Sequence, residues 1–238
     1  MDVAEMGCTI GAVKKGSRTF LLKNFDYSPT PIGWAEFTMR GALRHFALVD
    51  HEQQGVNSGL NEAGLGLVIS SSDLPGAYRL EKRTRINARI LSTCSSVNQA
   101  LTLLEEYAYM NRDMRGGNFL FADKRKIAIA EHFLGRIRRE VKEEGYIARA
   151  NHSVLGVVNN FNEGSGRRYR AMESFLKVLY EELDGLSDEE VLERCREVLL
   201  SPPILNDNTL GHIVIIIHDL SFHYAARNKS WKTFRFTR

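Results

Sequence analysis

The chain has 238 residues, of which 43% are hydrophobic and 26% are charged, and its formal net charge is +3. This length and apolar content suffice for one large core, so we expect one domain rather than two. The mild charge, without a long basic run or interleaved aromatic residues, argues against nucleic-acid binding. The apolar runs are too short to span a bilayer, so no membrane segment is expected.

The cysteines indicate the compartment. Cys8, Cys94 and Cys195 are widely spaced and odd in number, which argues against a disulfide framework and for a reducing, cytoplasmic setting. The residues before Cys8 include Asp2 and Glu5 and no apolar stretch, so no signal peptide is predicted. Neither the cysteines nor the histidines follow a ligand spacing, so we expect no metal and no other cofactor.

The first predicted element is a β-hairpin over residues 8–26, with a tight reversal at Gly16. Its first strand begins with a cysteine, and its second strand ends in polar residues. Pairing across the turn would return three of them to the level of Cys8, namely Lys23, Asn24 and Asp26. A thiol, a cation, an amide and a carboxylate would then share one end of a sheet.

The later elements alternate between groups of strands and pairs of helices. Strands are predicted over 35–38, 43–50, 56–58 and 65–71, and helices over 83–91 and 96–107. A meander of strands over 118–150 precedes a Gly-rich loop at 161–166, amphipathic helices over 168–183 and 187–199, and strands over 213–218, 222–226 and 231–236. This segregation predicts an α+β fold in which two packed sheets have helices outside them.

Six different short motifs occur once each along the chain: Gly-Cys-Thr at 7–9, Leu-Leu-Lys-Asn-Phe-Asp at 21–26, Asn-Glu-Ala-Gly-Leu at 61–65, Gly-Asn-Phe at 117–119, Ala-Asn-His at 150–152 and Arg-Arg-Tyr at 167–169. In this order and spacing they resemble the N-terminal-nucleophile amide hydrolases with a cysteine nucleophile. That group holds the choloylglycine hydrolases, penicillin V acylases and isopenicillin-N acyltransferases. The resemblance implies a four-layer αββα sandwich.

The resemblance also implies a processing step. Residues 1–7 would be a propeptide removed by autoproteolysis, and residues 8–238 would form the single mature domain. Small Gly7 leaves room for an N-to-S acyl shift onto Cys8. The α-amine freed in this way has an ordinary pKa near 8, close to about 8.5 for a thiol, so it can serve as the base for the nucleophile.

Five other residues take roles from the same resemblance. Lys23 stands where the choloylglycine-type enzymes carry arginine, and it would favour the thiolate with a single charge but without a bidentate fork. Asp26 would hold the α-amine. Asn151 would donate to the oxyanion, the backbone N–H of Ser71 would be a second donor, and Arg168 would anchor the carboxylate network.

Structural interpretations stay open beside these roles. Cys8 would be a buried core cysteine, Lys23 a solvated residue at a strand end, and Asp26 a turn former.

Neighbouring residues compete with two of the assigned positions. Arg167 and Arg170 are rivals of Arg168, because an arginine at a helix start is commonly exposed. We interpret His152 as a structural histidine, and Asn118 as a scaffold residue of its motif.

The resulting hypothesis is a cysteine amidohydrolase that cleaves a linear, non-peptide C–N bond of a small-molecule amide through an acyl-thioester on Cys8. One alternative is an acyltransferase that moves an acyl group from a thioester or amide to an amine on the same site. Another is an unprocessed, non-catalytic protein of the same fold. Substrate specificity is expected in loops at 28–34 and 72–78, and the resemblance leaves a homo-oligomer open.

Overall fold

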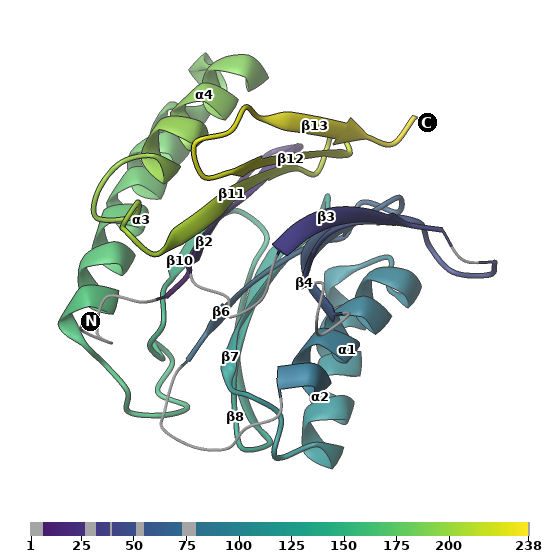
Figure 1. The fold of residues 1–238 in the computed structure, drawn as a ribbon. Helices are drawn as coiled ribbons and strands as arrows, with labels where there is room; N and C mark the ends of the chain where they lie inside the picture. The colour runs from purple at the N-terminus through teal and green to yellow at the C-terminus, as the bar shows by residue number, and fades with distance from the viewer. Residues whose placement is uncertain (1–6, 27–31, 39, 51–54, 73–79, 238) are drawn as a thin grey trace.

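The computed structural model describes residues 7–26, 32–38, 40–50, 55–72 and 80–237. Two antiparallel sheets pack face to face, and each sheet carries a pair of helices on its outer face (Figure 1). This arrangement confirms the predicted α+β sandwich of four layers. Residues 1–6 of the predicted propeptide and most of the two predicted specificity loops lie outside the described residues.

The first sheet has the strand order β10-β1-β2-β11-β12-β13 and carries α3 and α4. Its elements are β1 (Thr9–Lys15), β2 (Arg18–Asp26), β10 (Gly145–Arg149), β11 (Thr209–Ile216), β12 (Ser221–Ala226), β13 (Lys232–Arg235), α3 (Glu163–Glu182) and α4 (Asp188–Leu199). A 3-10 turn, η2 (Leu183–Gly185), joins the two helices.

The second sheet runs β3-β4-β5-β6-β7-β8-β9 and carries α1 and α2. Its elements are β3 (Ile32–Phe37), β4 (His45–Asp50), β5 (Gly55–Asn61), β6 (Gly66–Ser71), β7 (Gly117–Ala122), β8 (Ile127–Phe133), β9 (Arg136–Lys142), α1 (Leu80–Thr93) and α2 (Val97–Met110).

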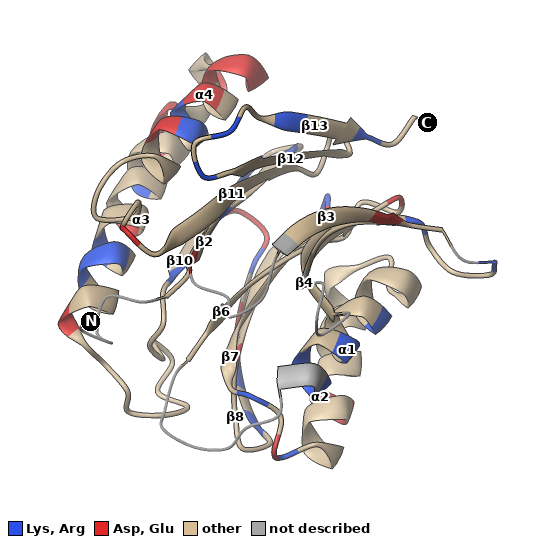
Figure 2. Ribbon diagram, viewed as in Figure 1, with Lys and Arg blue, Asp and Glu red and all other residues tan. Residues whose placement is uncertain are grey.

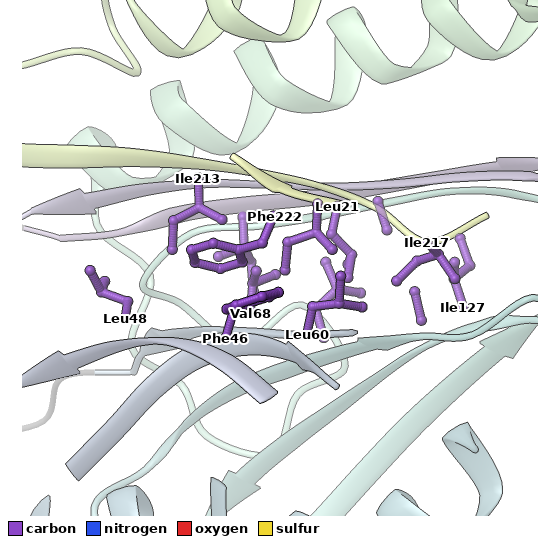
Figure 3. Close-up of a cluster of buried hydrophobic side chains, with 14 of the residues drawn as sticks. Leu21, Phe46, Leu48, Leu60, Val68, Ile127, Ile213, Ile217 and Phe222 are labelled. Atoms are coloured by element: carbon purple, nitrogen blue, oxygen red, sulfur yellow. The ribbon is translucent and has the colours of Figure 1, made fainter. Parts of the chain in front are cut away.

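Three apolar layers separate the four structural layers. The central one lies between the sheets, where side chains from the two facing sheets interdigitate (Figure 3). Along β11, Ile213 and Ile215 face this central layer, whereas Val214 and Ile216 face the helices. A strand buried on both faces reads as a continuous apolar run, which is why the sequence of β11 shows no polar alternation.

The N-terminal hairpin forms as predicted. β1 and β2 pair in register across a turn in which Gly16 adopts φ +55°, and Thr9 lies opposite Asn24. Positive φ suits glycine because it has no Cβ to clash with the backbone. The polar end of β2 is therefore brought back beside the start of β1.

The predicted meander is correct for three strands and wrong for the fourth. β7, β8 and β9 pair in chain order, but β10 leaves the second sheet and pairs with β1 in the first. On β10, Ile147 packs between the sheets and Ala148 packs beneath the helices, so this strand is buried on both faces. Local alternation does not reveal which sheet a strand joins, because both sheets offer the same backbone partners.

Helix α3 begins earlier than predicted. The Gly-rich stretch at 161–166 is predicted to be a loop, yet the helix starts at Glu163, where the side chain of Asn162 accepts a hydrogen bond from Ser165 N at 2.8 Å. Gly166 packs against Phe161, and a Cβ on this glycine would lie 2.7 Å from the ring. Glycine here serves close packing rather than flexibility.

Charged residues of both signs are spread over the outer helices and the edge strands (Figure 2). None of the described helices combines the length and apolar character needed to cross a membrane. Within the described parts of the chain, no three His, Cys, Asp or Glu residues gather closely enough to hold a metal ion.

Candidate active site

Cys8 directly precedes β1 and is 8% exposed, within the apolar cluster between the two sheets. Because side chains alternate along a strand, Lys23 and Phe25 of β2 face the same space as Cys8. Asn24 and Asp26 face the opposite side, toward the segment before β11. The hairpin thus places a cation beside the thiol, and a carboxylate on the other face of the same strand end.

Lys23 crosses from the first sheet to the second. Its Nζ donates to Ile69 O at 2.6 Å, to Ser58 Oγ at 3.2 Å and to Asn57 Oδ1. Burial lowers the pKa of this ammonium to about 8, and the nearby charges of Cys8 and Asp26 oppose that effect. The side chain is fully buried, so the solvated strand end is wrong for Lys23.

Asp26 is buried and held by the segment that leads into β11. Its carboxylate accepts hydrogen bonds from Asn206 Nδ2 at 2.6 Å and from Thr209 Oγ1 at 2.8 Å. Burial raises the pKa of Asp26 to about 6, although these two hydrogen bonds and the charges of Arg168 and Lys23 pull it down. The carboxylate is therefore mostly ionised at pH 7. A turn formed by Asp26 would fall on residues 27–31, which lie outside the described residues.

Asn151 links three of the predicted site residues. Its Nδ2 donates to Ser71 O at 2.7 Å, and its Oδ1 accepts from Arg168 Nη2 at 3.1 Å. Ser71 lies at the end of β6, where Arg83 Nη1 donates to its Oγ at 3.0 Å. An amide nitrogen carries two hydrogens, so the bond to Ser71 accounts for one of the two on Asn151.

Arg168 is the buried member of the three competing arginines. It is 3% exposed, whereas Arg167 and Arg170 are exposed and Arg170 pairs with Glu163 at 2.6 Å. The charge of Arg168 also acts on Asp26. Burial and the bond to Asn151 favour Arg168 over its two neighbours for this position. Cys8, Lys23, Asp26, Ser71, Asn151 and Arg168 thus fall into one connected cluster.

Gly7 lies against the amide of Asn151. A Cβ added to this glycine would stand 1.9 Å from Asn151 Oδ1, and its φ of +151° lies in the region that favours glycine. Only a residue without a side chain fits between the start of β1 and Asn151. The Gly7–Cys8 peptide is therefore positioned beside an amide that is itself fixed by Arg168 and Ser71.

The backbone that carries Asn151 is clamped from two sides. Asn118 Nδ2 donates to Ala150 O at 2.8 Å and to His152 O at 3.4 Å, and Ser70 Oγ donates to Ala150 O at 2.5 Å. On the other side, Ser165 Oγ accepts from Asn151 N at 2.8 Å. Asn118 is the scaffold residue that its motif suggests, and the segment it holds carries the predicted oxyanion donor.

The segment after Asn151 is fixed by a buried ion pair. Glu131 accepts from Arg149 Nε at 2.7 Å, from Ser153 Oγ at 2.5 Å and from the backbone N–H groups of Val154 and Leu155 at 3.0 Å. Such a carboxylate, fully paired and hydrogen-bonded, can be buried without an unmatched charge.

His152 serves structure, as interpreted. Its Nδ1 lies 2.7 Å from Ser165 Oγ, and its ring packs edge-on against Phe161 and Tyr169. Burial lowers its pKa, so the ring is neutral at pH 7. Cys94 and Cys195 are buried core thiols, also as predicted.

Four residues of the site belong to no motif in the sequence analysis: Asn57, Arg83, Asn206 and Thr209. Asn57, Asn206 and Thr209 come from elements distant in the sequence from the groups they contact, and Arg83 comes from the helix that follows β6, so spacing along the chain reveals none of these contacts. Arg168 did have a signal. It stands in helical phase with Met172, Leu176 and Leu179 on the buried face of α3, which distinguishes it from its neighbours.

We expect Asn118→Ala to lower turnover by on the order of 10²-fold, because loss of the donor to Ala150 O displaces the oxyanion donor on the next residue. Asn61→Ala is the matched control. Asn61 is equally buried and also donates to two backbone carbonyls, those of Leu91 and Cys94, away from the site.

Both substitutions should lower the free energy of unfolding by about 1–3 kcal/mol, but only the first should reduce kcat. Thermal unfolding and steady-state kinetics on the two variants check this. Equal losses of kcat would mean that Asn118 has no special role at Asn151.

The sequence was compared with protein families, with curated proteins and with solved structures. The profile of the family described as acyl-coenzyme A:6-aminopenicillanic acid acyl-transferase matches residues 13–225. The chain belongs to this acyl-transferase family. No individual curated protein matches the sequence.

Solved structures with the same fold are distant in sequence. Penicillin V acylase from Agrobacterium tumefaciens has a TM-score of 0.62 at 13% identity, over 96% of this chain and 86% of that one. The Caenorhabditis elegans orthologue of N-acylethanolamine-hydrolyzing acid amidase has a TM-score of 0.62 at 15% identity, over 89% and 92%. A mutant of the conjugated bile acid hydrolase from Clostridium perfringens also has a TM-score of 0.62, at 10% identity, over 97% of both chains.

These similarities confirm the predicted fold type, that of the N-terminal-nucleophile hydrolases. The chain is thus a member of a family of acyl-transferring enzymes, with the fold of proteins described as an acylase, an amidase and a hydrolase.

Proposed function

We propose that Cys8 becomes N-terminal by self-cleavage of the Gly7–Cys8 bond and then acts as the nucleophile of a hydrolase for linear, non-peptide amides. The observation that carries the proposal is the packing of Gly7 against the amide of Asn151, beside a thiol that shares its face with the buried ammonium of Lys23. A peptide bond held between a nucleophile and an amide donor has the arrangement that acyl transfer requires.

The first step is an N-to-S shift. The Cys8 thiolate attacks the Gly7 carbonyl, the C–N bond breaks, and the Cys8 nitrogen takes a proton to become an amine. Water then hydrolyses the thioester, which frees residues 1–7 with a carboxylate on Gly7 and restores the thiol. Lys23 favours the thiolate through its charge, and the remaining N–H of Asn151 stabilises the oxyanion.

In the mature enzyme the new α-amine is the base. It takes the thiol proton as Cys8 attacks the amide carbonyl, and it returns a proton to the leaving amine. The ionised Asp26 holds the resulting ammonium, which an acceptor-only carboxylate is suited to do. Water attacks the acyl-thioester and completes hydrolysis. The backbone N–H of Ser71 is proposed as the second oxyanion donor.

An acyltransferase on the same residues is the second candidate, and the description of the matching family favours it. In that reaction an amine, rather than water, attacks the acyl-thioester. The catalytic groups are the same in both reactions. The acceptor that reaches the thioester decides between them.

Intact-mass spectrometry and product analysis test the proposal. Incubated protein should lose residues 1–7 and then cleave members of a panel of N-acyl amides to the free acid, with or without an added amine. Accumulation of an acylated amine instead would favour the acyltransferase. A chain that stays intact and turns over no amide or thioester would return the protein to the non-catalytic alternative.

Lys23 should set the alkaline limit of self-cleavage. Its pKa is about 8, so the ammonium is charged below that pH and loses its charge above it. We expect the rate of loss of residues 1–7 to fall above pH 8, because a neutral amine no longer favours the thiolate.

In Lys23→Arg the guanidinium stays charged, so this fall should disappear. Lys14→Arg is the control, since Lys14 is a buried lysine of the same sheet that donates to Gly16 O, away from the site. Rates measured by mass spectrometry across neutral and alkaline pH check the prediction. The same alkaline fall in Lys23→Arg would show that another group causes it.

A further inference from the structure

A small basic cavity adjoins the candidate active site. It has a volume of about 190 Å³ and is lined by Gly164, Arg167 and Arg168 from the start of α3, and by Pro203, Leu205 and Asn206 from the segment between α4 and β11. Among the described residues that line it, two carry guanidinium groups and none carries a carboxylate. The reaction proposed above makes no use of this space.

Two lining residues connect the cavity to the site. Arg168 donates to Asn151 Oδ1 at 3.1 Å, and Asn206 donates to the carboxylate of Asp26 at 2.6 Å. The cavity therefore adjoins Asn151 and Asp26 through these two lining residues. It lies at the side of the site where the α-amine would be held.

Gly7 is linked to the cavity through Asn151. A Cβ on Gly7 would stand 1.9 Å from Asn151 Oδ1, the oxygen that accepts from Arg168. Cleavage of the Gly7–Cys8 bond converts the Gly7 carbonyl into a carboxylate at this point. A carboxylate formed next to one buried guanidinium, with a second lining the adjoining space, has the partners that charge-assisted hydrogen bonds need.

Charge on the peptide itself adds to this match. Residues 1–7 carry Asp2 and Glu5 and no basic side chain. The cavity has room for a carboxylate together with the residue that bears it, since a water occupies about 30 Å³ of liquid volume. The first turn of α3 also contributes the positive end of the helix dipole.

We propose that this cavity is a carboxylate-binding site and that its ligand is the Gly7 carboxylate of the peptide released by processing. The inference rests on the proposed self-cleavage. The released peptide stays bound through Arg167 and Arg168, covers the new N-terminus of Cys8, and competes with substrate until it dissociates. Dissociation of the peptide is then a step in activation that follows cleavage.

A matched pair of peptides tests the assignment. One is a synthetic peptide of residues 1–7 with a free C-terminal carboxylate, and the other is the same peptide with a C-terminal amide. Binding is measured by the fluorescence anisotropy of a dye on the peptide N-terminus. The protein is the chain that begins at Cys8, prepared either by self-cleavage or by a site-specific protease that leaves Cys8 first.

We expect the acid peptide to bind at least about tenfold more tightly than the amide. Arg167→Gln should remove most of this difference, because Arg167 lines the cavity. Arg170→Gln is the matched control, since Arg170 lies on the same helix, is exposed and pairs with Glu163 outside the cavity. Equal binding of acid and amide, or equal effects of the two substitutions, would overturn the proposal.

A competition experiment distinguishes the two possible ligands, the peptide of residues 1–7 and a small free carboxylate. N-acetylglycine carries the same terminal group without the rest of the peptide, and N-acetylglycinamide is its neutral counterpart. Weak displacement by the acid alone, at millimolar concentration, supports the proposal. Displacement by N-acetylglycine at the concentrations at which the full peptide acts would overturn the peptide as ligand and assign the cavity to small carboxylates.

The peptide-binding measurement can be made whether or not the wild-type chain cleaves itself, because a protease can also prepare the chain that begins at Cys8. Failure of the proposed function appears as an intact chain without turnover. Failure of the present inference appears as equal binding of the two peptides to the trimmed chain.

Discussion

Replacing Cys8 by alanine is expected to leave the chain at its full length and to lower amide turnover by at least about 10⁴-fold. The thiol is the attacking atom in both self-cleavage and catalysis, so neither reaction has a route without it. Losses of this size are typical when a covalent nucleophile is removed. Intact-mass spectrometry measures the first effect. Kinetics on a Cys8→Ala chain from which residues 1–7 have been trimmed measure the second without requiring self-cleavage.

Cys195→Ala is the matched control. Cys195 is a fully buried thiol on α4, and burial raises its pKa, so it is a core side chain rather than a nucleophile. This variant should lose some stability and keep both processing and turnover. Loss of residues 1–7 from Cys8→Ala would show that another group or a contaminating protease cleaves the chain, and the proposed mechanism would fall.

The part of the site that the sequence predicted is the part made by one hairpin. A tight turn fixes the register of two adjacent strands, so the positions of Lys23 and Asp26 near Cys8 follow from local chain geometry alone. The direction of each side chain also follows, because alternation along β2 places Lys23 on the same face of the sheet as the thiol and Asp26 on the opposite face. The later motifs supplied Asn151 and Arg168 only through resemblance.

What the sequence left out is the set of partners that give these groups their properties. Lys23 is held by Asn57 and Ser58 of the opposite sheet, and Asp26 by Asn206 and Thr209 at the far end of the chain. Sheet-to-sheet packing decides these contacts, and no local pattern encodes it.

The same limit explains the errors in the fold. β10 pairs with β1 and is buried on both faces, and α3 begins inside a Gly-rich stretch in which Gly166 packs closely against Phe161. In each case a tertiary contact overrides a local preference.

Asp26→Asn is expected to combine a loss of function with a gain in stability. The pKa of Asp26 is about 6 in the folded chain and near 3.8 without burial, so the folded state binds this proton more tightly than the unfolded state does. Its contribution to stability is therefore greatest below about pH 4, falls as the pH rises through 6, and stays low at pH 7. The difference corresponds to about 3 kcal/mol.

Asparagine is neutral at every pH, so the substitution removes this cost. Its single oxygen can accept from Asn206 Nδ2, and its amide nitrogen can donate to Thr209 Oγ1, because a hydroxyl can accept as well as donate. We expect the free energy of unfolding at pH 7 to rise by about 1–3 kcal/mol and its decline between about pH 4 and 6 to become shallower. Turnover should fall by on the order of 10²–10³-fold, because no carboxylate holds the α-ammonium. Chemical denaturation across this pH range, together with kinetics on the trimmed chain, measures both effects.

Asp123→Asn is expected to have the opposite effects on stability and activity. Asp123 is also buried, but it accepts hydrogen bonds from the backbone N–H groups of Val97, Arg125 and Lys126 at 2.7–2.9 Å, far from Cys8 in the fold. An amide offers one oxygen where the carboxylate used two, so this variant should lose stability and keep its activity. If Asp26→Asn instead loses stability and keeps its turnover, as expected for Asp123→Asn, then Asp26 is a structural carboxylate. The proposal that Asp26 holds the α-ammonium of Cys8 would then be wrong.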